Sequence, residues 1–195
     1  MTNQKPSRRE AILHALVELL QTDPGARITT AGLARTVGVT EAALYRHFPS
    51  KRKMFEALIE FAEDAVFSRC QVILQEQEDA RTRLLQLAHL VLVFAERNPG
   101  LCCVLTGDAL MGEDAALRKR ASQFFDRLET QLRQVLKEGE IREGLRPRTS
   151  AARGAEFVMV FLEGRTQRFV RSSFARLPTA DFEESWGLVS QSVWG

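Results

Sequence analysis

The residues with the most informative spacing lie between positions 28 and 48, where hydroxyl, small and apolar side chains recur at helical intervals. Leu33, Ala34 and Val37 are predicted to form the inner face of one short helix, and Leu44, Tyr45 and Phe48 recur at helical spacing in the next. Gly38 can adopt the left-handed conformation that ends the first helix, and Thr40 can cap the second. Such a pair is typical of a helix-turn-helix, whose second helix enters the major groove of DNA. The spacing therefore predicts contact with a duplex.

Side chains on the outer side of this pair have the chemistry to bind base edges and phosphates. Glu41 can accept from a cytosine amino group, or it is simply an acid placed favourably near the start of its own helix. Ala42 and Ala43 can touch thymine methyl groups, although Ala43 is also small enough just to let the backbone approach. The full set of predicted DNA-binding residues is Thr29, Thr30, Thr40, Glu41, Ala42, Ala43, Tyr45, His47 and Lys51.

A basic run, Lys51-Arg52-Lys53, occupies the first turn of the next predicted helix, where cations oppose the helix dipole. A DNA phosphate would explain this run, and a merely solvated cluster is the alternative. Through Phe55 the chain carries nine Lys or Arg and four Asp or Glu, whereas the remaining 140 residues carry 18 and 21. This asymmetry favours a phosphate-facing head, with Lys5, Arg8 and Arg9 on its arm, over a helical hairpin without a ligand.

The elements that position these residues are all expected to be helices, about nine in number, because no segment alternates as a strand would. A capping box at Ser7 to Glu10 predicts a first helix to about Thr22, and Ser50 is expected to cap a long fourth helix. Later helices are expected from Leu84 to Asn98 and over about 101–106, 114–138, 150–172 and 182–194, with breaks at Gly139 and Gly144.

The last two predicted helices carry more apolar surface than one neighbour can cover. Their apolar girth and the closing tryptophans, Trp186 and Trp194, predict a symmetric homodimer through 150–172 and 182–194. Such a dimer would present two heads to a palindromic site with half-sites about 34–36 Å apart, or a multiple of that.

The composition favours some protein classes and argues against others. Cys70, Cys102 and Cys103 lack ligand spacing, so buried reduced thiols are expected, with a Cys102–Cys103 disulfide as the alternative. We expect no metal, no cofactor and no enzyme activity, because no paired carboxylates, nucleophile elbow or phosphate-binding glycine loop is evident. No segment reaches the roughly 20 apolar residues of a membrane span, and the start lacks a signal-peptide core, so we expect a cytoplasmic, nucleoid-associated protein.

The run Ala43-Leu44-Tyr45-Arg46-His47-Phe48, followed by Lys51, resembles the DNA-binding domain of the TetR family of bacterial regulators. Segments 58–70, 96–111, 128–144 and 168–174 extend the resemblance to the nucleoid occlusion factors within that family. The resemblance implies an all-α TetR-like fold. It divides the chain into a three-helix DNA-binding domain over 1–53, joined by a long helix to a dimerisation and partner-binding domain over 54–195.

The resemblance also implies a function. It indicates a regulator that binds specific chromosomal sites and, while bound, antagonises assembly of the tubulin-like protein FtsZ, so that no septum forms over the nucleoid. The residues implied to bind the FtsZ C-terminal tail are Phe61, Arg69, Leu90, Arg97 and Asn98. Apolar contacts flanked by cations suit an acidic, apolar tail.

Simpler roles for these tail residues stay open. Phe61 and Leu90 fit the apolar stripes of their own helices, and Asn98 fits a helix end. The chain departs from the family at Val93, where a glycine is expected, and at Gly32, where a basic residue is expected. The alternative function is a transcriptional repressor released by a small ligand held inside the body.

Overall fold

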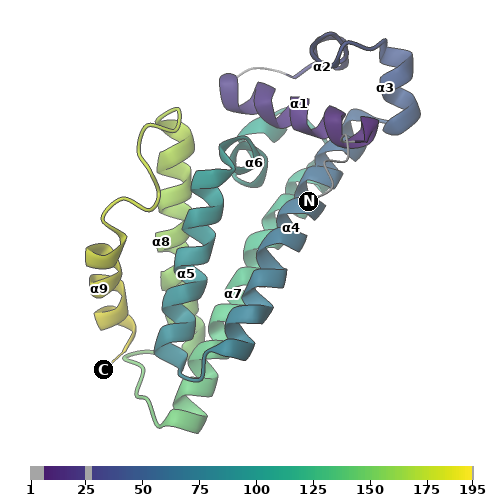
Figure 1. The fold of residues 1–195 in the computed structure, drawn as a ribbon. Helices are drawn as coiled ribbons and strands as arrows, with labels where there is room; N and C mark the ends of the chain where they lie inside the picture. Colours follow the sequence, from purple (N-terminus) through teal and green to yellow (C-terminus); the bar gives the residue numbers. More distant parts are fainter. Residues whose placement is uncertain (1–6, 25–27, 195) are drawn as a thin grey trace, which may run out of the picture. The chain divides into compact units, whose positions relative to one another are not determined.

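The computed structural model describes residues 7–24 and 28–194 of the chain, and Lys5 of the predicted basic arm lies outside them. The described residues form helices and connecting loops without a strand, which confirms the prediction of an all-α chain of about nine helices (Figure 1). The helices are α1 (Arg8–Thr22), α2 (Thr30–Val37), α3 (Glu41–His47), α4 (Lys51–Glu76), α5 (Ala80–Arg97), α6 (Pro99–Leu105), η1 (Asp108–Leu110), α7 (Ala115–Glu143), α8 (Ala151–Arg171) and α9 (Phe182–Val193).

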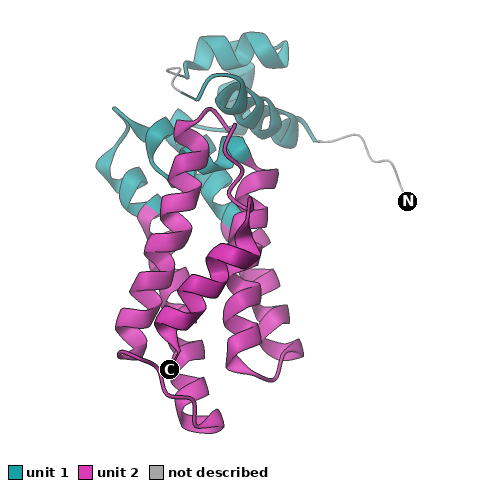
Figure 2. Ribbon diagram, turned by 90° about the vertical axis from the view of Figure 1, so that its left-hand side faces the viewer, with its two compact units in different colours: residues 1–62, 99–121 teal, residues 63–98, 122–195 magenta. Residues whose placement is uncertain are grey.

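The chain forms two compact units, coloured separately in Figure 2. Unit 1 comprises residues 1–62 and 99–121, and unit 2 comprises residues 63–98 and 122–195. The helices α4 and α7 therefore each contribute residues to both units. In the described part of the chain no single helix has the length and apolar composition of a membrane span. The helices α5 and α6 have them only when they are counted together as one bent pair.

Local capping signals set the first three helices of unit 1. Ser7 and Glu10 form the expected capping box on α1. The hydroxyl of Thr29 accepts from the Gly32 amide at the start of α2, and that of Thr40 accepts from the Ala43 amide at the start of α3. Gly38 ends α2 with a φ of 74°, a backbone conformation that residues other than glycine rarely adopt. The turn between α2 and α3 therefore has the geometry that its sequence predicts.

A buried core holds the two helices of the turn together. The side chains of Leu33, Ala34, Leu44 and Phe48 are at most 3% exposed. Ala34 and Leu44, the residues expected where the two helices cross, both belong to this core. These four residues form a packed core as the pattern predicts, whereas Val37 is only partly buried and Tyr45 is exposed.

The short helix α6 belongs to unit 1 and packs against α1. All seven of its residues are buried. A Cβ atom added to Gly100 would lie 2.3 Å from the backbone oxygen of Val17, so only glycine fits where the two helices meet. The thiol of Cys103 donates to the carbonyl of Leu20 at 3.8 Å. Residues 99–105 are thus an integral part of the base on which α1 rests.

Cys70, Cys102 and Cys103 are buried thiols that are not joined in disulfides, as expected from the sequence. Burial raises the pKa of the Cys70 thiol to about 11 and that of Cys103 to about 12. Burial also raises the pKa of Cys102. The thiolate form that would react with an oxidant is therefore scarce at neutral pH.

One predicted break in unit 2 is wrong. The helix α7 does not end near Glu138 but continues through Gly139 to Glu143, and Gly144 ends it with a φ of 65°. A Cβ atom on Gly139 would lie 2.7 Å from the Cβ of Ala80, so this glycine allows a close approach to the start of α5. A glycine needed for packing and a glycine that stops a helix give the same sequence signal.

The helix α8 has one buried and one exposed apolar face. Its buried face contains Ala155, Val158, Met159, Leu162 and Phe169. On another face Phe157 is 47% exposed and Val160 is 65% exposed, while Leu188 of α9 is 67% exposed. Because Phe157, Val160 and Gly164 follow one another at intervals of three and four residues, they lie along one side of α8.

The closing aromatics do not add to that exposed surface. Trp186 is 7% exposed and Trp194 is 2% exposed, because both side chains are buried within unit 2. Arg81 lies over the ring of Trp194, with its guanidinium carbon 5.3 Å from the ring centroid. The sequence argument that these tryptophans need a second subunit is therefore wrong, and the apolar faces of α8 and α9 are the surface that needs covering.

Candidate nucleic-acid interface

The predicted DNA-binding residues are accessible on α2, α3 and the start of α4. Thr29, Thr40, Glu41, Ala42, Tyr45 and His47 are exposed, and Thr30, Ala43 and Lys51 are partly exposed. Tyr45 is 43% exposed although its neighbour Leu44 is fully buried. The helix α3 thus buries one face against the turn and presents the other to solvent, as a recognition helix must.

A chain of hydrogen bonds joins three of these residues. The Tyr45 hydroxyl donates to the Thr30 oxygen at 3.4 Å, and the Thr30 hydroxyl donates to the Glu41 carboxylate at 2.7 Å. The chain links the first turn of α2 to both ends of α3. The Glu41 side chain is therefore held in place before any base is present, and part of its acceptor capacity is used by Thr30.

Two cationic residues outside the predicted set lie beside the same face. Arg8 and Arg46 line a hollow of about 420 Å³, together with Ile12, Val39, Ala43 and His47. Arg9 is held differently, because its guanidinium carbon lies 4.7 Å from the centroid of the Phe48 ring. Arg46 lies inside the family motif and Arg8 lies on the basic arm, so the sequence contained a signal for both. Neither was included among the specific contacts.

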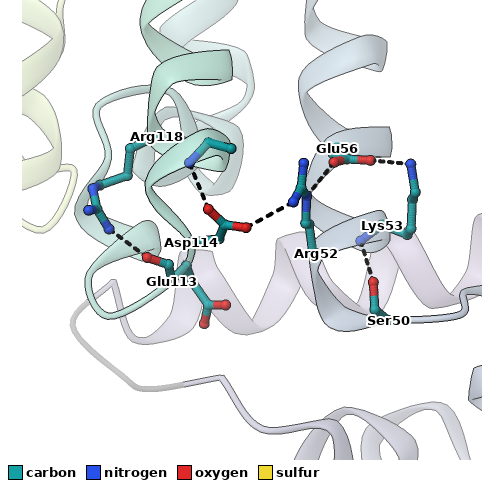
Figure 3. Close-up of polar contacts among 8 residues, drawn as sticks. Ser50, Arg52, Lys53, Glu56, Glu113, Asp114 and Arg118 are labelled. Atoms are coloured by element: carbon teal, nitrogen blue, oxygen red, sulfur yellow. Dashed lines mark hydrogen bonds and ion pairs between the residues drawn. The ribbon is translucent and has the colours of Figure 1, made fainter.

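Carboxylates of unit 1 pair with the basic run at the start of α4, and Figure 3 shows Arg52 and Lys53 beside Glu56 and Asp114. The Lys51 amine lies 2.5 Å from Glu113, and the Arg52 guanidinium lies 2.8 Å from Asp114. Glu56 bonds both Lys53, at 2.6 Å, and Arg52, at 2.7 Å. Hydrogen bonds from Lys53 and then Arg52 lower the pKa of Glu56.

These pairs correct the sequence argument about the three cations. An external anion and simple solvation were the two explanations considered, whereas the structure provides protein carboxylates as partners. Glu113 and Asp114 are 62 residues from their partners in the chain, a separation at which no local pattern signals contact. The cations therefore have a structural role in unit 1 besides the predicted contact of Lys51 with phosphate.

The residues implied to bind the FtsZ tail lie on α4, on α5 and at the end of α5. Phe61 is 57% exposed on α4, so it is not a core residue. Arg69 and Arg97 are exposed, and Leu90 is partly buried. Asn98 is the C-cap residue of α5, and its side-chain amide donates to the Phe94 carbonyl at 2.8 Å. Asn98 therefore does terminate its helix, as the simpler interpretation proposed.

The helical fold and the exposed face of α2 and α3 define a DNA-binding regulator. Residues 12–58 match the family described as "Bacterial regulatory proteins, tetR family". Residues 78–193, more than half of the chain, match "Tetracyclin repressor-like, C-terminal domain". The chain belongs to the tetR family of bacterial regulators, which confirms the resemblance seen in the motif.

Two relatives of high identity carry the same name. The chain is 87% identical over 195 residues to the "Nucleoid occlusion factor SlmA" of Marinobacter nauticus, with 100% of both chains covered. It is 50% identical over 193 residues to the protein of the same name in a Marinomonas species, covering 99% of this chain and 98% of the relative. The similarity to nucleoid occlusion factors thus extends over the whole chain.

Solved structures of other regulators share the fold. The ketosteroid transcriptional regulator KstR2 of Mycobacterium tuberculosis gives a TM-score of 0.78 at 21% identity, covering 100% of this chain and 98% of that one. The MbdR regulator from Azoarcus gives a TM-score of 0.81 at 17% identity, covering 95% and 98%. At these identities the likeness shows the architecture alone.

Proposed function

We propose that the protein is a nucleoid occlusion factor. It binds specific palindromic sites on the chromosome as a homodimer and, while bound, antagonises FtsZ assembly, so that no division septum forms over the nucleoid. The observation that carries this proposal is the 87% identity, over the full length of both chains, to a relative named as a nucleoid occlusion factor. In this proposal the protein works in the cytoplasm, on the nucleoid.

The face of α2 and α3 supports the DNA-binding part. Thr40, Glu41, Ala42 and Ala43 lie at the start of α3, where side chains reach base edges in the major groove. The remaining proposed contacts, which bind the sugar-phosphate strands, are Thr29, Thr30, Tyr45, His47 and Lys51. In this assignment the residues 1–53 form the DNA-binding domain and 54–195 the dimerisation and partner-binding domain.

The exposed apolar faces of α8 and α9 support the homodimer. Phe157, Val160 and Leu188 are each at least 47% exposed, and a second copy would remove them from water. A Cβ atom on Gly164 or Gly187 would meet nothing within 4 Å, so these glycines leave room for a closely packed partner helix. We therefore propose that these two helices pair with their counterparts about a twofold axis.

The exposure of Phe61 supports a partner site in the proposed domain 54–195. A phenylalanine that is 57% exposed in the middle of a long helix has no packing role to explain it. The exposed cations Arg69 and Arg97 suit an acidic tail. We assign Phe61, Arg69, Leu90, Arg97 and Asn98 to the FtsZ C-terminal tail, with Val93 narrowing the site relative to the glycine of the family.

Light scattering of purified FtsZ with GTP tests this proposal. A duplex selected from a random-sequence pool by the protein serves as the DNA. The protein with this duplex should suppress the scattering, and the protein alone should do so much less. Full FtsZ assembly at saturating protein and duplex would refute the proposal.

Variants separate the two activities. Arg69→Ala and Arg97→Ala should retain the wild-type affinity for the duplex and lose suppression of FtsZ assembly. Arg171→Ala removes an exposed arginine at the end of α8 and serves as the matched control, which should keep both activities. Retained suppression in the Arg69 and Arg97 variants would show that the tail binds elsewhere.

The alternative, a transcriptional repressor released by a small ligand, has weaker support. The transcriptional regulator KstR2 resembles the chain in fold, whereas both sequence relatives described above carry the nucleoid occlusion name. A thermal-shift screen of metabolites followed by a duplex-release assay distinguishes the two. A compound that both stabilises the protein and releases it from its duplex would favour the repressor.

A further inference from the structure

Two neighbouring acids, Glu113 and Asp114, hold the first two cations of α4. We call them the acid pair. The Lys51 side chain is 21% exposed and that of Glu113 is 22% exposed, so this ion pair is better shielded from solvent than a typical surface pair. Arg52 adds a second bond, to Asp114, at 2.8 Å. The acid pair and the cations all belong to unit 1.

The acid pair stands in conflict with the proposed DNA contact of Lys51. The amine that is expected to bind a phosphate already donates to the Glu113 carboxylate at 2.5 Å. A phosphate brought to the same amine would lie close to the carboxylate, and two anions at that separation repel each other. Full engagement of the DNA strand by Lys51 therefore favours departure of the Glu113 side chain.

The acid pair also holds the first turn of α7. The Asp114 carboxylate accepts from the Ala116 amide at 2.8 Å, which caps the helix. The Arg118 guanidinium donates to the Glu113 carbonyl at 2.6 Å, and Figure 3 shows Asp114 between Arg118 and Arg52. A displacement of residues 113 and 114 would thus release contacts at the beginning of α7.

We propose that the acid pair is an internal phosphate mimic that exchanges with the DNA backbone. In the free protein Glu113 and Asp114 occupy Lys51 and Arg52. On DNA a phosphate takes the place of Glu113 at Lys51, and the first turn of α7 loosens. The helix α7 continues from unit 1 into residues 122–143 of unit 2. The exchange therefore makes the start of a helix shared by both units depend on whether DNA is bound. This inference rests on the DNA binding of the proposed function.

A double-mutant cycle tests the exchange. Affinity for the selected duplex is measured by fluorescence anisotropy for the wild type, Glu113→Gln, Lys51→Gln and the double variant. Glu113→Gln should tighten binding about threefold to tenfold, and this gain should fall below about twofold in the Lys51→Gln background. Glu60→Gln, which removes an exposed acid of α4 outside this network, is the control for net charge and should change affinity less than about twofold.

Each outcome of the cycle decides the matter. A gain that depends on Lys51 supports competition at that amine. An equal gain in both backgrounds would show a general effect of charge and overturn the proposal, as would no gain at all. Circular dichroism and the Tm of each variant verify that it is folded. Failure of the wild type to bind any duplex is a separate result, which refutes the proposed function itself.

Hydrogen exchange tests the consequence for α7. Binding of the selected duplex should speed exchange of the amides of residues 116–118 about threefold or more, because their cap at Asp114 is loosened. The amides of residues 82 and 83 in the first turn of α5, which is capped by Asp79, serve as the internal reference. Unchanged or slower exchange at 116–118, with binding verified in the same sample, would overturn the coupling.

Discussion

The outer face of α2 and α3 and the start of α4 adjoin in sequence but are held in place in different ways. On the first, Thr30, Glu41 and Tyr45 are joined by hydrogen bonds over at most 15 residues of chain. On the second, Lys51 and Arg52 are held by acids 62 residues away. The comparison teaches that the face proposed to recognise bases is preorganised by local structure, whereas the adjoining cations depend on a distant segment.

Removing part of the buried core beneath α2 and α3 should have the largest effect on stability. Leu44 is fully buried between α2 and α3, and Leu44→Ala leaves a cavity there. We expect a loss of about 2–5 kcal/mol in the free energy of unfolding of the region that contains it. Urea denaturation followed by circular dichroism measures the loss, with Ala42→Ser on the exposed face as a control. A loss below about 1 kcal/mol would mean that the two helices do not depend on this core.

Across the two regions, the proposed phosphate contacts and the proposed base contacts should differ in how they affect DNA binding. Thr29→Ala and Lys51→Ala should weaken binding by about 1–2 kcal/mol on all sequences, because they remove phosphate contacts. Glu41→Gln and Ala43→Ser should instead change which base pairs are preferred. Anisotropy titrations with the selected duplex and its single-base variants measure both effects. Equal losses for all four variants on matched and mismatched duplexes would show that α3 is not the recognition helix.

Loss of a helix cap in the first region should have a smaller effect. Thr40→Ala removes the hydroxyl that accepts from the Ala43 amide at 3.1 Å, and it should cost about 1 kcal/mol of stability. Thr40→Ser retains the hydroxyl and should stay close to the wild type in a thermal melt. Equal losses for the two variants would assign the effect to the methyl group.

The smallest effect concerns the pH dependence of the second region. Lys53 and Arg52 lower the pKa of Glu56 below its ordinary value of 4.5. A carboxyl with a lowered pKa in the folded state stabilises the protein above the ordinary value, and the stabilisation is lost as the pH falls through the folded pKa.

A comparison of melts at pH 7 and pH 3.5 measures this contribution. Between these pH values the Tm of the wild type should fall by about 1–3 °C more than that of Glu56→Gln, since partly exposed pairs contribute little. Identical falls for the two proteins would show that the pairs around Glu56 contribute no pH-dependent stability.

The parts of the fold that were predictable from the sequence are those set by neighbours along the chain. The caps Ser7, Thr29 and Thr40 and the left-handed Gly38 were expected and are present. Residues three or four apart determine such features, so a single sequence contains the whole signal. Neighbours along the chain also determine which side chains of α3 are exposed.

The features that were missed depend on residues far apart in the chain. Gly139 resembles a helix end in the sequence because its close approach to Ala80 has no local signature. The partners of Lys51 and Arg52 were missed for the same reason. Trp194 was expected at a subunit interface because its contact with Arg81, on another helix, is not visible in the sequence. Tertiary contacts decide these positions, and a local pattern does not report them.

The most direct test of DNA recognition is an anisotropy titration at low ionic strength, with the selected palindromic duplex and a random duplex of the same length. We predict at least about tenfold tighter binding to the palindrome, and an affinity that falls steeply as salt is added. Equal affinity for the two duplexes would contradict the account.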